Sequence, residues 1–248
     1  MKPPGGQDST ARSTAAGIVL AAGSGTRFGG SVNKAYLPLA GQSLISWSLN
    51  VMAEINEISP LVLVIRPEDH RRAEAVLDKE VTADVEIVYG DSTRQGSELR
   101  AFRHLVPRID AGLVDSILIH DSARPLLSAE LCAAVLHATR DYGAAIPALY
   151  GPDMAMTGDG GGTVVELRHS HLVRAQTPQG FAARPLVDAY EAAARDGLDA
   201  TDTAGCVARY TDLPIRWISG EDQNFKITYA HDLVVAQQLI AAMDHQVH

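Results

Sequence analysis

The stretch GIVLAAGSGTRFGG, at residues 17–30, decides the fold that the sequence predicts. Residues 17–21 form a short apolar run, typical of a buried strand, and a glycine-rich loop follows at once. Glycines let successive backbone N–H groups converge on an anion, and Arg27 and Lys34 add positive charge nearby. A strand that leads into such a loop predicts a phosphate site at one edge of an α/β sheet.

The spacing of these glycines excludes two common phosphate-binding loops. The stretch contains no Gly-Lys-Ser/Thr, as a Walker A loop requires, and its glycines are spaced G-x-G-x-x-x-G instead of G-x-G-x-x-G. A nicotinamide-dependent oxidoreductase is therefore a poor fit to the sequence.

Outward from this loop, short β-branched runs alternate with stretches of helical periodicity. We predict strands at 17–21, 61–65, 85–89, 116–120 and 144–149, and helices at 44–55, 68–77, 96–105, 129–142, 185–195 and 231–243. Such alternation is typical of a doubly wound α/β fold, Rossmann-like, with a mostly parallel sheet and helices on both faces. Ligands of these folds bind beyond the carboxyl ends of the strands.

The segment 150–176 interrupts the alternation. Glycines at 158 and 160–162 separate two short runs that suit a β-hairpin, so we predict an inserted β-hairpin arm. A hairpin is poorly stable alone and gains by packing on another subunit, which predicts a homodimer formed through the arm. We predict a single domain over 17–248, after a disordered tail at 1–16 that is rich in Pro, Gly, Ser and Thr.

Composition narrows the partners and the compartment. The 248 residues carry a formal net charge of −9, which argues against binding to nucleic acid or to an anionic membrane. The sequence contains no apolar run of about 18 residues, as a spanning helix needs, and no signal-like segment at its start. With only Cys132 and Cys206, both in apolar surroundings, we expect free buried thiols and a cytoplasmic protein.

Five further motifs follow the first loop in a fixed order, and together they are specific. They are GDSTRQGS at 90–97, HDSARP at 120–125, QTPQGF at 176–181, Thr201-Asp202, and NFKIT at 224–228. With AAGSGTR at 21–27 and Lys34, this set resembles the 2-C-methyl-D-erythritol 4-phosphate cytidylyltransferases, members of the sugar nucleotidyltransferase superfamily. The ribitol-5-phosphate cytidylyltransferases share most of these motifs, and that alternative stays open.

The resemblance implies an activity. A Mg²⁺-dependent enzyme of this kind moves a cytidylyl group from CTP onto 2-C-methyl-D-erythritol 4-phosphate and releases pyrophosphate, in the non-mevalonate route to isoprenoid precursors. Joining two polyanions requires that charge be neutralised and reactants aligned, so cations should converge on the site. No general base is needed, because the second pKa of a phosphate monoester lies near about 6.

The resemblance also implies roles for individual residues. Arg27, Lys34 and Lys226 would be catalytic, and Asp121, which follows the apolar run 117–119, would hold Mg²⁺. The residues implied for CTP are Ala21, Ala22, Gly23, Gly25, Gly90, Ser92, Arg94 and Ser97. Those implied for the acceptor are Arg124, Asp153, His169 and Thr177.

Several positions depart from the family pattern, mainly in the acceptor half. Met154 and Met156 stand where relatives carry a threonine and a lysine, and His169 stands where they carry an arginine, although Arg168 and Arg174 lie nearby. Asn33 replaces a proline and Thr203 an acidic residue. These departures keep open a second class of function, a non-catalytic CTP-binding homologue.

Overall fold

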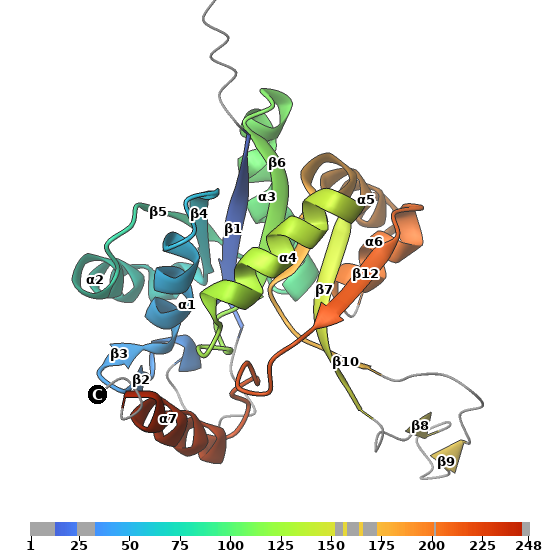
Figure 1. Ribbon diagram of the computed structural model, residues 1–248. Coiled ribbons are helices and arrows are strands. Elements are labelled where there is room, and N and C mark those ends of the chain that lie inside the picture. The colour runs from blue at the N-terminus through green and yellow to red at the C-terminus, as the bar shows by residue number, and fades with distance from the viewer. Residues whose placement is uncertain are drawn as a thin grey trace, which may run out of the picture.

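A central sheet of eight strands organises the protein (Figure 1). The computed structural model describes residues 13–23, 33–151, 156–157, 164–165, 173–200 and 202–244. The strands lie in the order β10-β7-β11-β6-β1-β4-β5, and β12 pairs with β7. Their bounds are β1 Thr14–Leu20, β4 Ile58–Ile65, β5 Val85–Tyr89, β6 Val114–Asp121, β7 Ala144–Tyr150, β10 Val173–Ala175, β11 Gln179–Ala182 and β12 Ile215–Ser219.

Most strand pairs in this sheet are parallel. β1 runs parallel to β4 and β6, β5 to β4, and β12 to β7, while β11 lies antiparallel between β6 and β7. The predicted fold class, a mostly parallel α/β sheet with helices on both faces, is confirmed. Because β1, β4 and β6 run in one direction, their carboxyl ends meet at one edge, where the loops that follow them converge.

The helices cover the two faces of the sheet in separate groups. Apolar side chains of α3, α5 and α6 pack on one face, and those of α1, α2 and α4 on the other. Helix α7 covers a third, smaller cluster with residues around β2 and β3. The bounds are α1 Leu44–Ala53, α2 His70–Glu80, α3 Arg94–Asp110, α4 Ala129–Tyr142, α5 Ala183–Asp196, α6 Thr203–Tyr210 and α7 Ala230–Asp244; short 3-10 helices η2 and η3 span Lys34–Tyr36 and Pro67–Asp69, and β2 and β3 span Pro38–Leu39 and Gln42–Ser43.

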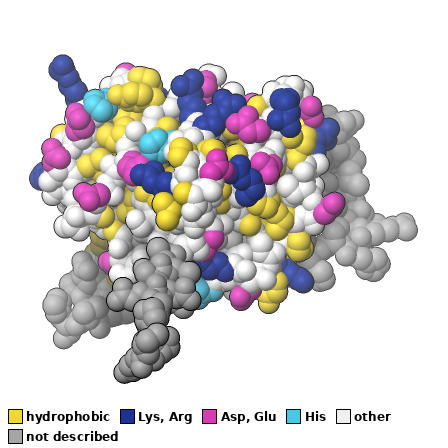
Figure 2. Space-filling view, turned by 90° about the horizontal axis from the view of Figure 1, so that it is seen from above, with side chains coloured by type: hydrophobic (Ala, Val, Ile, Leu, Met, Phe, Trp, Pro, Cys, Tyr) yellow, Lys and Arg dark blue, Asp and Glu magenta, His cyan; other side chains and the backbone are white. Residues whose placement is uncertain are grey.

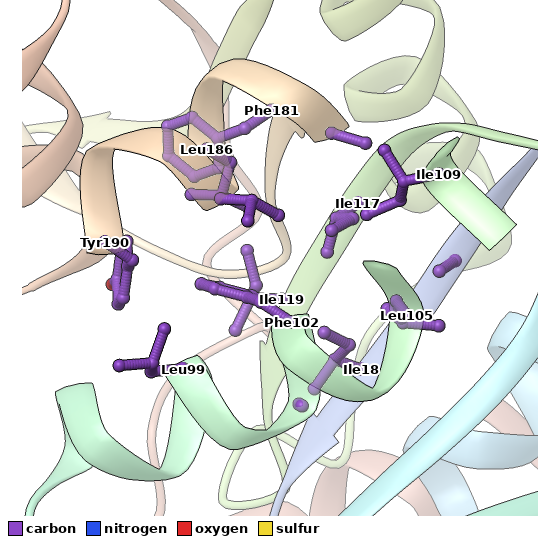
Figure 3. Packing of buried hydrophobic residues seen from close by; sticks show 14 of the residues in the cluster. Ile18, Leu99, Phe102, Leu105, Ile109, Ile117, Ile119, Phe181, Leu186 and Tyr190 are labelled. Carbon is purple, nitrogen blue, oxygen red and sulfur yellow. The ribbon is translucent and has the colours of Figure 1, made fainter. Parts of the chain in front are cut away.

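The core beneath α3 and α5 joins strand and helix side chains of matching shape. Figure 3 shows Ile18, Ile117 and Ile119 from the strands directed at the residues of these two helices. The ring of Tyr190 meets that of Phe102 edge to face, with centroids 4.8 Å apart. Fully burying such side chains stabilises the fold by about 1.5–3 kcal/mol each, which fixes α3 firmly against the sheet.

Two of the expectations about elements need correction. β1 begins at Thr14 and not at residue 17, because Ala15 and Ala16 are fully buried in the sheet. The last residues of the predicted tail, 14–16, therefore belong to this strand. Residues 1–12 of that tail lie outside the described residues. β10, β11, α6 and β12 were not predicted as elements of the main fold.

The predicted arm at 150–176 contains short antiparallel strand pairs. β7 pairs with β10, with Tyr150 opposite Val173, and β8, Met156–Thr157, pairs with β9, Val164–Val165. Figure 1 shows β8 and β9 beyond the ends of β7 and β10, apart from the main sheet. Residues 158–162, the predicted tip, lie outside the described residues.

Charges of both signs mix on the protein surface. Figure 2, which looks at the molecule from above, shows Lys and Arg side chains next to Asp and Glu with apolar patches between them. Ion pairs of this kind include Arg103 with Glu191 and Arg108 with Glu86. Among the described residues, none of the helices has the length and apolar character that crossing a bilayer requires.

Candidate active site

A cavity of about 790 Å³ opens at the carboxyl ends of β1, β4 and β6. It is lined by the end of β1, by the segment after β4, by the loop from β5 into α3, by the end of β6, and by residues on either side of these. The lining residues are Leu20, Ala21, Ala22, Gly23, Asn33, Lys34, Arg66, Pro67, Glu68, Gly90, Asp91, Ser92, Thr93, Arg94, Ser97, Asp121, Ser122, Ala123, Lys226 and Thr228.

The end of β1 is tied to the segment that starts at Asn33. The Asn33 amide donates to the Ala21 carbonyl at 2.7 Å and to the buried carboxylate of Asp69 at 2.9 Å. Its oxygen accepts from the N–H of Ala35 and caps η2, the short helix that carries Lys34. We call Asn33, Ala21 and Asp69 the Asn33 clamp. It fixes the chain on both sides of residues 24–32, which lie outside the described part.

The loop from β5 into α3 packs tightly against the end of β1. A Cβ on Gly90 would lie 2.7 Å from the Ala22 Cβ and 2.8 Å from the Ser97 hydroxyl oxygen, so a side chain does not fit. That oxygen accepts from the N–H of Asp91 at 2.9 Å, and the hydroxyl donates to the Thr93 carbonyl at 2.8 Å. The cavity wall here is thus largely backbone, held in shape by one serine.

Gly90→Ala is expected to weaken binding of a nucleotide in this cavity by about tenfold. The added methyl must push Ala22 or Ser97 away, and overpacking of this kind costs about 1–3 kcal/mol. Isothermal titration of CTP into the variant measures the effect. Gly112→Ala, whose Cβ would meet open space, is the control for the loss of a glycine, although its positive φ adds strain of its own. Wild-type affinity in Gly90→Ala would contradict the tight contact.

Two cations share one carboxylate beside this wall. Asp121, the last residue of β6, is 7% exposed. It accepts from Lys226 Nζ at 2.6 Å and from the Arg94 guanidinium through its other oxygen. Burial alone would raise the pKa of Asp121, but the charges of Arg94 and Lys226 outweigh burial and hold the pKa far below its usual range. Asp121 is therefore ionised at neutral pH.

The carboxylate of Asp121 suits a magnesium ion. Mg²⁺ is commonly held by one or two carboxylates and by phosphate oxygens of the substrate. Within the described part of the chain no group of three or more His, Cys, Asp or Glu side chains could hold a metal by itself. A single ionised carboxylate that lines this cavity fits the kind of site in which the substrate completes the ligand set.

A second, smaller cavity of about 210 Å³ adjoins the first. Its lining residues are Arg94, Asp121, Arg124, Ala175, Gln176, Thr177, Gln179, Asp202 and Lys226, of which Arg94, Asp121 and Lys226 also line the larger cavity. Arg124 donates to the carbonyl of Asn224 at 2.8 Å, while its buried Nε meets no hydrogen-bond partner among the described residues. Such an unsatisfied donor beside a cavity is typical of a site for an anion.

Hydrogen bonds fix the tautomer of His120 and, through it, the hydroxyl of Thr177. His120 Nε2 lies 3.0 Å from the Arg124 carbonyl, so it donates, and Nδ1 accepts from the Thr177 hydroxyl at 3.1 Å. The Thr177 oxygen in turn accepts from the N–H of Asp121. Burial lowers the pKa of His120 to about 4, so the ring is neutral at pH 7. His120 thus orients the hydroxyl of Thr177.

The structure brings together most of the residues that the sequence singled out. Seven of the eight residues implied for CTP line the larger cavity, as do Lys34, Lys226 and Asp121; Arg124 and Thr177 line the smaller one. Arg27, Gly25, Asp153 and His169 lie outside the described residues. Sequence reasoning missed Arg66, Glu68 and Asp202 as lining residues; Asp202 belongs to a motif that was recognised, whereas Arg66 and Glu68 belong to none.

Comparison with known proteins gives consistent matches over the whole described domain. A sequence profile of the 2-C-methyl-D-erythritol 4-phosphate cytidylyltransferase family, IspD, matches residues 15–242. The protein of that name from Cereibacter sphaeroides is 36% identical over 228 residues, which cover 92% of this chain and 97% of the relative. The bifunctional enzyme IspD/IspF of Dinoroseobacter shibae is also 36% identical, over 92% of this chain but 54% of its own length. This chain thus spans about half of that relative.

Solved structures agree with the sequence matches. The 4-diphosphocytidyl-2C-methyl-D-erythritol synthase of Anaerococcus prevotii has a TM-score of 0.80 to this chain at 25% identity, and the match covers 92% of this chain and 96% of the other. The region matched by the family profile includes every residue that lines the two cavities.

Proposed function

The chain belongs to the 2-C-methyl-D-erythritol 4-phosphate cytidylyltransferase family, and we propose that its larger cavity binds CTP and its smaller cavity the acceptor phosphate. The enzyme is a CTP-dependent nucleotidyltransferase. An oxygen of the acceptor phosphate forms a bond to the α-phosphorus of CTP. The bond from that phosphorus to the bridging oxygen of the β-phosphate breaks, and pyrophosphate leaves.

One observation carries this assignment. Arg94, Asp121 and Lys226 line both cavities, so the phosphates of two substrates, one in each cavity, would meet beside this group of charges. The nucleophile needs no general base, since a phosphate monoester is already largely doubly charged at neutral pH. The barrier is then repulsion between polyanions and their alignment, which fixed cations relieve.

Each basic residue has a distinct task in this proposal. Lys226 serves the α-phosphate, where charge develops during transfer, because its ammonium lies between the cavities. Lys34 binds the β- and γ-phosphates. Its Nζ donates to the Ile227 carbonyl at 2.8 Å, and this hydrogen bond holds the ammonium at the cavity. We assign Arg27 to the same phosphates on the family resemblance alone. Arg124 serves the acceptor phosphate from the far wall of the smaller cavity.

Asp121 is the residue that would hold Mg²⁺. A magnesium ion there would supply positive charge to the phosphate oxygens of CTP. In its absence Lys226 and Arg94 keep the Asp121 carboxylate ionised and oriented. The support for this part of the proposal is the donor chemistry of Asp121 and its position at the end of β6.

We propose that backbone groups of the cavity wall recognise the pyrimidine base of CTP. We assign the base to the wall formed by Ala21, Ala22 and Gly90, whose shape the close packing of Gly90 against Ala22 and Ser97 fixes. We further propose that the protein acts in the cytoplasm as a homodimer, joined through the arm that β7 and β10 begin. Size-exclusion chromatography with light scattering tests the dimer.

A panel of donors and acceptors with pyrophosphate release as readout tests the function. We expect turnover with CTP and 2-C-methyl-D-erythritol 4-phosphate, and much less with ATP or GTP as donor or with ribitol 5-phosphate as acceptor. Equal use of ATP would contradict the backbone-lined pyrimidine pocket. Preference for ribitol 5-phosphate would move the protein to the related cytidylyltransferases, and CTP binding without turnover on either acceptor would make it a non-catalytic homologue.

A further inference from the structure

A carboxylate lies fully buried behind the wall between the two cavities. Glu98, on the second turn of α3, is 1% exposed. Its Oε1 accepts from the Thr203 hydroxyl at 2.9 Å and lies 3.1 Å from Arg94 Nε, while its Oε2 accepts from the Tyr190 hydroxyl. Burying a carboxylate is costly, and here two hydroxyl hydrogen bonds and the nearby charge of Arg94 offset that cost.

The polar groups around Glu98 come from three helices. Arg94 is one turn earlier on α3, Tyr190 is on α5, and Thr203 begins α6. Figure 3 shows Tyr190 on the side of α5 that faces α3. Burial raises the pKa of Glu98 above its usual range, and the Arg94 charge and the two hydroxyl donors offset part of that rise. The hydroxyls of Tyr190 and Thr203 donate to the carboxylate, and Arg94 adds positive charge as an ion pair without a hydrogen bond from its Nε.

Arg94 links this buried carboxylate to the substrate cavities. The guanidinium contacts Glu98 through Nε and Asp121 through its NH1 nitrogen, and the residue lines both cavities. Burial works against the charged guanidinium, but Asp121 and Glu98 raise the pKa of Arg94. Without Glu98, the nearest carboxylate left to the guanidinium is Asp121, the same group that we assign to the metal and to Lys226.

We propose that Glu98 is a positioning residue: it holds Arg94 between the two cavities, so that the guanidinium stays aligned with the phosphates of both substrates. The inference rests on the proposed function of the site. Glu98 itself touches neither cavity and acts only through Arg94. Tyr190 and Thr203 hold the carboxylate in turn, and thereby couple α5 and α6 to the site.

A double-mutant cycle tests the proposal. Glu98→Gln keeps the size of the side chain and removes its charge, and we expect kcat/KM to fall about tenfold or more, mainly through higher KM values for CTP and acceptor, since small misplacements of a positioning group are costly. Arg94→Gln should show a similar or larger loss. Because Glu98 acts through Arg94, adding Glu98→Gln to Arg94→Gln should cause no further loss.

The cycle separates positioning from simple stabilisation. CTP affinity, measured by calorimetry, should follow the same non-additive pattern as the KM. Unchanged KM values and CTP affinity in Glu98→Gln, or losses that add in the double variant, would overturn the proposal. If Glu98→Gln does not fold, Thr203→Val replaces it in the cycle, because it removes one donor to the oxygen that faces Arg94; a smaller loss that vanishes beside Arg94→Gln is then expected, and additive losses again overturn the proposal.

The wild-type measurement keeps this inference distinct from the proposed function. If the wild-type protein releases no pyrophosphate from CTP with any acceptor, the proposed function fails. If wild-type turnover is present and the cycle is additive, only the role of Glu98 fails.

Discussion

Lys226→Met is expected to lower kcat/KM for cytidylyl transfer by about a hundredfold or more, with most of the loss in kcat. The ammonium of Lys226 lines both cavities and lies 2.6 Å from the Asp121 carboxylate, so it is fixed before substrate arrives. A fixed charge that meets charge developing on the α-phosphate stabilises the transition state more than the bound substrate. Stopped assays of pyrophosphate release under saturating CTP and acceptor measure the change.

Methionine keeps much of the length and apolar body of the lysine side chain, so the change isolates the charge. Lys79→Met, at an exposed position on α2, is the matched control and should leave turnover unaltered. Wild-type kcat in Lys226→Met would show that the charge lies off the reaction path and that the two cavities do not meet there.

Asp121→Asn is the second variant with a large expected effect. It keeps the shape of the side chain and removes the charge, so we expect kcat/KM to fall about a hundredfold or more and the Mg²⁺ concentration for half-maximal rate to rise. CTP titrations with and without Mg²⁺ should show that the metal no longer strengthens binding. Turnover measured against Mg²⁺ concentration gives the same answer independently.

Asp91→Asn is the matched control for this change. Asp91 lines the same cavity, but its carboxylate pairs with Arg100 at the surface and caps the N–H of Ser92. Its substitution should leave the Mg²⁺ dependence near that of the wild type. An unaltered Mg²⁺ dependence in Asp121→Asn would mean that the metal is held by other residues.

Secondary structure was predicted best where one hydrophobic pattern runs through a whole strand or helix. The strands β1, β4, β6 and β7 are largely buried apolar runs and β5 is a partly buried edge strand; each overlaps the run that predicted it, although β1 and β4 begin at Thr14 and Ile58, before residues 17 and 61. β11 escaped prediction because Gln179 and Gly180 are poor strand formers; a Cβ on Gly180 would lie 2.0 Å from the Thr139 hydroxyl oxygen, so close packing on α4 requires the glycine. α6 is one of the shorter helices and shows its start only through the cap that Asp202 provides.

The residues of the candidate site could be predicted where they belong to the sequence motifs. The residues implied for CTP line one cavity because they follow neighbouring parallel strands, whose carboxyl ends lie at the same edge of the sheet. The role of Glu98 was not predictable, since Arg94 and Glu98 four residues apart look like an ordinary exposed pair on a helix. Only the packing of α5 and α6 buries Glu98, and the hydroxyl of Thr203 then donates to its carboxylate.

The Asn33 clamp joins the two described ends of the chain on either side of residues 24–32. One side-chain amide closes the chain across them, from the Ala21 carbonyl to the start of η2, and the buried Asp69 anchors that amide from a third segment. These hydrogen bonds hold the two ends together, and the entropic cost of closing the chain between them grows only slowly with the number of residues enclosed. Substitutions within 24–32 that spare Arg27 should therefore leave the scaffold intact and keep the preference for CTP, since Ala21, Ala22 and Gly90 lie outside this segment.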